Sequence, residues 1–131
     1  MVIEGKAGFQ IMGDWAKGEF TAAGKTPGVD YYCSPTPSNN GYLYNVDSFI
    51  FYKTSDPDKQ EGQKLLAKLM MGKNFQKVFN LYKGSIPARL DVSMDEFDKC
   101  AKTSNADIKT AGASGGCLLY TSDAADELCS G

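Results

Sequence analysis

The sequence predicts an α/β domain in which short strands pack with helices. Segments rich in aromatic and β-branched residues alternate along the chain with segments that start at a helix-capping residue and carry apolar residues at helical spacing. The length of 131 residues and the 42% share of hydrophobic residues suffice for one domain with its own core. A disordered chain would have fewer apolar residues.

Charge and composition exclude several classes of function. The 14 Lys and Arg residues are interspersed with 16 Asp and Glu residues, so no basic patch is available for nucleic acid. The lack of histidine excludes Ser-His-Asp and Cys-His catalysis and His-ligated zinc. No apolar run approaches the roughly 18–20 residues that cross a bilayer, and the first six residues lack the layout of a signal peptide. We expect no cofactor, no metal, no nucleic-acid partner and no membrane-spanning segment.

Three β-prone runs in the first half of the chain predict strands. The first run alternates around Phe9 and Ile11 and stops at a glycine, which is typical of a half-buried strand that ends in a tight turn. The last run is aromatic and β-branched, and its polar residues need either backbone partners or a wet cleft. The strands are expected over residues 7–12, 29–33 and 42–52, with a Pro- and Asn-rich loop over residues 34–41.

Four segments start with a helix signal. Asp14 is a good N-cap, Asp56 followed by Pro57 is a strong helix start, and Ser93 with Glu96 forms a capping box. The first helix is expected over 15–23 with Gly24 at its end, and the second from 57 to Gly72 with a buried stripe of Leu65, Leu66, Leu69 and Met70. The third is expected from a cap at Asn74, with a loop over 83–89 behind it and an apolar side formed by Phe75, Val78, Phe79 and Tyr82. The fourth is expected from 93 to about 102.

The end of the chain does not resemble the rest. The pattern of apolar residues fails beyond Ser104, and residues 108–116 have a linker-like composition. From Cys117 onward the sequence resembles the in-frame translation of a common transposase-type sequencing adapter, and a disordered natural tail is the alternative. The domain organisation is therefore expected to be 1–107 as protein, 108–116 as a linker and 117–131 as a non-native read-through tail.

Cys33 and Cys100 are the two cysteines that remain once the tail is set aside. A disulfide between them would close a loop of 67 residues and stabilise the fold by about 4 kcal/mol in the chain-entropy model. Such a bond is typical of an oxidising compartment such as a periplasm. Two reduced, buried thiols are the alternative.

Four blocks of the sequence resemble one protein family. Residues 4–16, which read Glu-Gly-Lys-Ala-Gly-Phe-Gln-Ile-Met-Gly-Asp-Trp-Ala, resemble the strand–turn–helix motif of family 1 of the bacterial extracellular solute-binding proteins of carbohydrate ABC transporters. Blocks at residues 45–49, 75–80 and 83–92 follow in the order of that family and are most similar to its glucose- and mannose-type members. The resemblance, over residues 1 to about 107, implies the C-terminal portion of a two-lobed periplasmic-binding-protein fold, located in the periplasm.

Three candidate ligand-binding residues lie near the corner after the first predicted strand and in the loop after the third helix. The resemblance implies that Asp14 accepts hydrogen bonds from sugar hydroxyls, and that Trp15 stacks on the sugar or lines the site. Lys83 is expected to donate to a hydroxyl and to pair with Asp14. The structural alternatives are an N-cap for Asp14, a core position for Trp15 and a solvated lysine.

The third predicted strand contributes three further candidates, Asn45, Asp47 and Ser48. The resemblance places them at a return into the hinge between the two lobes, where one or two of them would reach the ligand. Satisfying the hinge backbone is the equally supported alternative.

The leading prediction is a protein that binds a mono- or oligosaccharide between two lobes and delivers it to the permease subunits of an ABC importer, without making or breaking a bond. One alternative is a secreted glycoside hydrolase that uses Asp14 and Asp47 as paired carboxylates. Another is a structural fragment whose exposed apolar face associates non-specifically.

Overall fold

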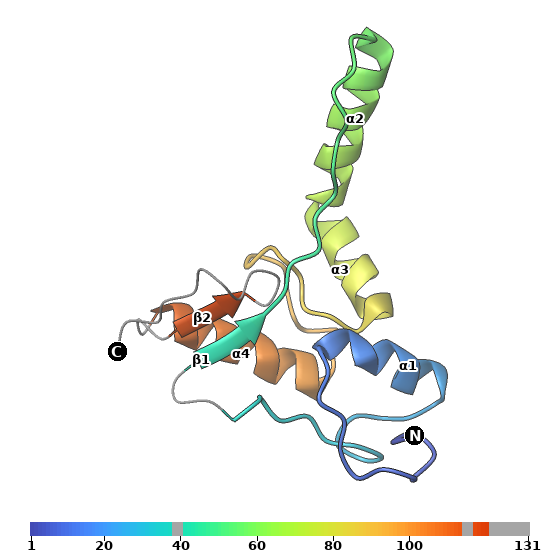
Figure 1. Ribbon diagram of the computed structural model, residues 1–131, viewed down its shortest axis with the longest axis vertical. Coiled ribbons are helices and arrows are strands. Elements are labelled where there is room, and N and C mark those ends of the chain that lie inside the picture. Colours follow the sequence, from blue (N-terminus) through green and yellow to red (C-terminus); the bar gives the residue numbers. More distant parts are fainter. Residues whose placement is uncertain (38–40, 114–116, 121–131) are drawn as a thin grey trace.

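The computed structural model describes residues 1–37, 41–113 and the backbone of 117–120, and helices dominate it (Figure 1). In chain order the elements are a 3₁₀ turn η1 (Asp14–Ala16), α1 (Lys17–Ala22), β1 (Gly41–Tyr44), α2 (Pro57–Met70), α3 (Lys73–Lys83), α4 (Lys99–Ala113) and β2 (Cys117–Tyr120). The strands β1 and β2 pair in parallel, with Gly41 opposite Cys117. Helices with one short parallel pair are compatible with part of an α/β fold.

Two of the predicted strands are not formed. Residues 7–12 lie in no strand. Phe9 and Ile11, which were predicted to be half buried, are 94% and 89% exposed. Residues 29–33 contribute only one isolated bridge, between Pro27 and Tyr31. Strand propensity reflects packing on a pleated surface, and no neighbouring strand among the described residues offers these segments such a surface.

The third predicted strand is much shorter than expected. Only its first residues belong to β1, and residues 45–52 are irregular and exposed. Part of the loop expected over 34–41 lies outside the described residues. The partner of β1 is β2, which belongs to the stretch predicted to be a non-native tail; residues 121–131 of that tail lie outside the described residues.

The first helix ends as predicted but begins differently. Gly24 adopts a φ of 72° and donates its N–H to the Thr21 carbonyl at 2.9 Å, as a helix-ending glycine does. Gly13 and not Asp14 occupies the N-cap position of η1, and it makes no side-chain cap bond. The prediction that Asp14 caps this helix is therefore wrong.

The helix α2 begins as predicted, but its apolar stripe is exposed. Asp56 caps it by accepting hydrogen bonds from the N–H groups of Asp58 and Lys59 at 3.0 and 3.4 Å. Only Met70 of the stripe is buried, and Leu69 is 60% exposed. Figure 1 shows the reason: α2 extends away from the other helices, and among the described residues the extended chain that follows β1 is the segment that runs beside it.

The helix α3 starts at a different cap and ends where predicted. Gly72 is its N-cap, so Asn74 lies inside the helix, contrary to prediction. Gly84 ends the helix with a φ of 88° and donates its N–H to the Asn80 carbonyl at 2.9 Å. The predicted apolar side of α3 lies against an open apolar hollow of about 530 Å³ lined by Phe75, Val78, Phe79, Tyr82 and Lys83.

The helix α4 starts later and continues further than the sequence predicts. The carboxylate of Asp98 accepts the N–H of Ala101 at 2.8 Å and so caps the helix. Ser93 instead forms a local turn with Asp95, and the predicted capping box does not open a helix. Residues 108–113 are helical and not linker-like, whereas 114–116 lie outside the described residues.

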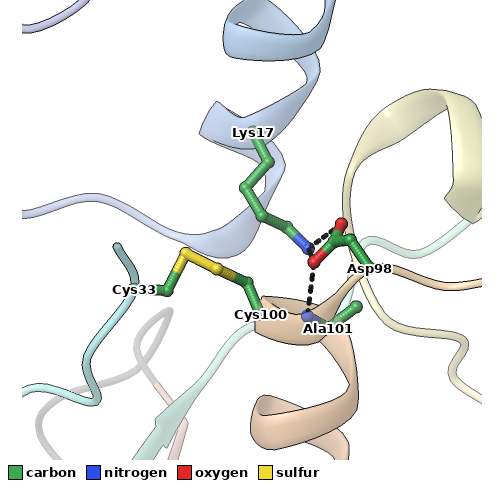
Figure 2. The surroundings of a disulfide bond; sticks show 5 residues. All are labelled: Lys17, Cys33, Asp98, Cys100 and Ala101. Carbon is green, nitrogen blue, oxygen red and sulfur yellow. Dashed lines mark hydrogen bonds and ion pairs between the residues drawn. A yellow bond between two sulfur atoms is a disulfide. The ribbon is translucent and has the colours of Figure 1, made fainter. Parts of the chain in front are cut away.

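The core is small, with its buried residues drawn from α1, the end of α2, the loop before α4 and the start of α4. A disulfide joins Cys33 to Cys100 with a Cα–Cα distance of 5.6 Å, which confirms the predicted bond. Beside it the ammonium of Lys17, a residue only 5% exposed, donates to both oxygens of Asp98 at 3.1 and 2.9 Å (Figure 2). The buried apolar residues are Phe20, Met70, Val92, Phe97, Cys100 and Ala101.

Among the described helices, none has both the length and the apolar composition needed to cross a membrane.

Candidate functional site

An open hollow of about 570 Å³ lies where α1, the segment after β1 and the end of α3 meet. The chain reaches it from three places far apart in the sequence. Its lining contains an indole, a phenol, an amide, two carboxylates and an ammonium, which is a mixture suited to a polar ligand with apolar faces. The lining residues are Trp15, Gly18, Glu19, Asn45, Asp47, Tyr82 and Lys83.

Trp15 forms part of one wall of the hollow. It lies in η1, directly before α1, and is 42% exposed, so the predicted alternative of a core position does not hold. A Cβ atom at Gly13 would overlap the six-membered part of the indole ring. The lack of a side chain at Gly13 therefore allows the indole ring to pack directly against the backbone at this residue.

A second part of the lining contains an ion pair between Lys83 and Asp47. Lys83 is the last residue of α3, and its ammonium donates to Oδ2 of Asp47 and lies 5.7 Å from the ring centroid of Phe79. Asn45 donates its side-chain amide to Oδ1 of Asp47 at 3.3 Å. The hydrogen bond from Lys83, and then the positive charge of Lys83, hold the pKa of Asp47 below its usual value.

Asp14 is not among the lining residues, although the sequence predicts it as a ligand-binding group. Its Oδ2 accepts the backbone N–H of Ile86 at 3.0 Å, which connects η1 to the loop after α3. Burial raises the pKa of this carboxyl, while the Ile86 hydrogen bond, Lys17, Ser85 and Lys83 act in the opposite direction. The predicted pair of Asp14 with Lys83 is wrong, because the lysine pairs with Asp47.

Ser48 is exposed and does not line the hollow. The structure thus brings four of the six predicted ligand-binding residues together, Trp15, Asn45, Asp47 and Lys83, and leaves Ser48 and Asp14 outside the lining.

Two polar lining residues, Glu19 and Tyr82, are absent from the sequence-based candidates. The signal for Glu19 was its spacing: it lies four positions after Trp15, and residues four apart share one face of a helix. Tyr82 was assigned to the apolar side of α3, but it is 85% exposed and lies between the two hollows.

The hollow offers binding chemistry. Asn45 supplies both donors and an acceptor, Asp47 supplies acceptors, and Trp15 supplies an apolar face with one N–H donor. Within residues 1–37 and 41–113, no group of three or more Asp, Glu, Cys or His side chains is placed to hold a metal ion.

Comparison with known proteins places the chain in a recognisable class. No protein-family model matches it. It is, however, 48% identical over 116 residues to a "probable sugar-binding periplasmic protein" of Mesorhizobium japonicum, a match that covers 88% of this chain and 28% of the relative. The chain is therefore a homologue of solute-binding proteins, and the predicted family resemblance is confirmed.

Two further relatives agree with this assignment. A protein of Brucella suis biovar 1 with the same name is 49% identical over 116 residues, covering 88% of this chain and 27% of the relative. An "uncharacterized ABC transporter extracellular-binding protein" of Pyrococcus horikoshii is 36% identical over 104 residues, covering 79% of this chain and 23% of the relative. The chain thus spans about a quarter of the length of the curated relatives it matches.

Proposed function

We propose that this chain forms one wall of a sugar site in a periplasmic solute-binding protein, which delivers the sugar to the permease subunits of an ABC importer. The observation that carries the proposal is the convergence of Trp15, Asp47 and Lys83 on one open hollow from three separate segments. The names of the relatives, which describe sugar binding and a periplasmic location, support the same class of ligand and compartment.

The chemistry of the hollow fits a sugar. The C–H face of a sugar packs on an aromatic ring, and Trp15 is half exposed at the wall of the hollow. Sugar hydroxyls need paired donors and acceptors, which Asp47, Asn45 and Lys83 supply together. Micromolar affinity corresponds to about −8 kcal/mol, within reach of a few hydrogen bonds and one or two stacked rings.

We expect the 131-residue chain to bind sugars only weakly, because it matches about a quarter of its relatives and offers one wall of the site. The test is therefore made on the protein encoded by the uninterrupted reading frame around this sequence. Isothermal calorimetry with glucose, mannose and a disaccharide measures its affinity. Lack of a heat signal with all three sugars would contradict the proposal.

Variants assign the binding to the hollow. Trp15→Ala and Asp47→Asn are each expected to weaken sugar binding about tenfold or more, since each removes a stacking surface or a charged acceptor. Asp58→Asn is the matched control for Asp47, because Asp58 is also an exposed aspartate but lies in the first turn of α2, away from the hollow. Equal affinities of the Asp47 and Asp58 variants would remove the hollow from the site.

Glycoside hydrolysis by Asp14 and Asp47 receives less support. The carboxylate of Asp14 is bonded to the backbone of Ile86, and that of Asp47 to Lys83. A glycoside hydrolase needs both carboxyl groups at the same glycosidic bond, so each of these would first have to give up its present partner. Release of nitrophenol from nitrophenyl glucoside or mannoside by the longer protein, lost in Asp14→Asn, would establish the enzyme instead.

A further inference from the structure

The start of α1 and the end of α3 touch through their backbones at two glycines. A Cβ atom at Gly18 would lie 2.8 Å from the carbonyl oxygen of Lys83. A Cβ atom at Gly84 would lie 2.6 Å from the backbone nitrogen of Gly18 and 3.2 Å from the carbonyl carbon of Lys17. Contacts this short with backbone atoms do not occur in folded proteins, so the approach requires glycine at both positions.

This contact lies between the two walls of the hollow. Trp15 and Glu19 flank Gly18 on one side of the contact, and Tyr82 and Lys83 directly precede Gly84 on the other. Gly18 itself lines the hollow. The contact therefore joins the two segments that carry the indole and the ammonium of the hollow.

Independent bonds hold both partners of the contact. Asp14 connects η1 to the loop after α3 through the Ile86 N–H, and the buried Lys17 binds Asp98 before α4 (Figure 2). On the other side Gly84 has a φ of 88°, a conformation that other residues rarely adopt. An added methyl group must then either widen the hollow or break one of these bonds, since the backbone cannot simply move aside.

We infer that the Gly18–Gly84 contact is a positioning device that sets the spacing between the two walls of the hollow, and with it the affinity for the ligand. The inference rests on the proposed function in its second part only. Its first part, the placement of Trp15 in the hollow, is a property of the 131-residue chain and is tested without any sugar.

Two pairs of variants isolate the contact. Gly18→Ala is compared with Gly62→Ala, because Gly62 is also helical but an added Cβ there meets nothing within 4 Å. Gly84→Ala is compared with Gly24→Ala, because both glycines have positive φ, 88° and 72°, and only Gly84 has a neighbour within 4 Å. The differences within each pair report the contact, since helix propensity and backbone strain are shared.

The first readout is the emission of Trp15, the single tryptophan of the 131-residue chain. We expect Gly18→Ala and Gly84→Ala to shift its emission maximum or its quenching by iodide, and the two controls to leave both unchanged, in protein whose circular dichroism is native. The second readout is the dissociation constant for sugar of the longer protein. It should rise about tenfold or more in the contact variants and stay within twofold in the controls.

The outcomes separate the inference from the proposed function. Equal Trp15 emission within each pair of folded variants overturns the positioning role. Altered emission with unchanged sugar affinity overturns the link to the ligand, and so does a loss of stability alone. If the longer wild-type protein binds no sugar, the proposed function fails, and the Trp15 signal still decides whether the contact positions Trp15 in the hollow.

Discussion

The carboxylate of Asp14 connects two segments that are 72 residues apart in the sequence. Burial raises its pKa, so the native state holds this proton more tightly than the unfolded chain. The contribution of Asp14 to stability therefore decreases as the pH rises from the ordinary pKa of 3.8 through the raised value. At neutral pH the fold contains a half-buried carboxylate that its neighbours stabilise only in part.

Two substitutions separate the charge of Asp14 from its hydrogen bond. Asp14→Asn keeps an acceptor for the Ile86 N–H and removes the charge, so at pH 7 we expect stability equal to or above wild type. Asp14→Ala leaves this N–H without a partner and should cost about 1–3 kcal/mol. Urea unfolding at pH 7 and pH 3 measures both, and the advantage of Asn should shrink at pH 3. Equal losses in the two variants at pH 7 would contradict this account.

The two partners of the ion pair between Lys17 and Asp98 are buried to different degrees. The side chain of Lys17 is 6% exposed and that of Asp98 is 34% exposed. Asp98→Asn keeps the cap on Ala101 but leaves a buried ammonium without its carboxylate, and should destabilise the fold by about 3–5 kcal/mol. Lys17→Met leaves a carboxylate that still reaches water and should cost less. Chemical unfolding of both variants measures the difference, and a larger loss for Lys17→Met would exclude this explanation.

Residue types predicted the candidate site better than they predicted the role of each residue. Trp15, Asp47 and Lys83 were identifiable because stacking, acceptor and donor groups occur beside turns, and all three line the hollow. Their role in binding remains a prediction. Asp14 was harder to interpret, because its partner is the backbone N–H of Ile86 on a distant loop, and the residues around Asp14 do not indicate this contact.

Some helix ends were predictable from the sequence, but three of the four predicted helix starts, at Asp14, Asn74 and Ser93, were wrong, and so were two of the three predicted strands. The cap at Asp56 and the stops at Gly24 and Gly72 depend on the conformation of a few neighbouring residues, and they are formed as predicted. A strand depends on a partner that the local sequence does not specify. Residues 7–12 have the right pattern and lie in no strand, whereas Gly41–Tyr44 pairs with a segment that was set aside as a tail.

The disulfide, which joins the segment before β1 to α4, is expected to contribute a large part of the stability of the fold. It closes a loop of 67 residues, which corresponds to about 4 kcal/mol in the chain-entropy model. Cys33 is exposed, so a reductant can reach the bond, whereas Cys100 lies in the core.

The double substitution Cys33→Ser with Cys100→Ser should therefore lower the free energy of unfolding by several kcal/mol. Dithiothreitol should lower that of the wild type to a similar level and leave the double variant unchanged. Chemical unfolding with and without the reductant measures both. A wild type that unfolds at the same denaturant concentration in both conditions would show that the bond adds little.

Seen as a whole, the chain exposes an unusual amount of apolar surface along α2. Leu65, Leu66 and Leu69 are 59%, 46% and 60% exposed, and the extended chain beside them carries the exposed residues Phe49, Ile50, Phe51 and Tyr52. Several large apolar side chains exposed on neighbouring segments are typical of a face that is covered by another protein surface. Alone in solution, the 131-residue chain should associate.

Substitutions on α2 test this expectation. The double variant Leu65→Gln with Leu69→Gln should remain monomeric at concentrations where wild type forms larger species, since it removes apolar side chains that are more than half exposed. Lys64→Gln with Lys68→Gln, on the same helix, is the control and should behave like wild type. Sedimentation velocity across a concentration series measures both. Monomeric wild type at high concentration would contradict the expectation.

Side chains from α3 and from the loop behind it hold the junction between α2 and α3. Gln76 donates to the carbonyl of Met70 at 2.9 Å and accepts the N–H of Ala88 at 3.0 Å, and Arg89 donates to the carbonyl of Met71 at 3.2 Å. These bonds connect the end of α2 to the loop that follows Gly84. A protein that binds along α2 is therefore expected to change amide hydrogen exchange at residues 84–88, because these bonds connect the end of α2 to the loop that leads away from the hollow.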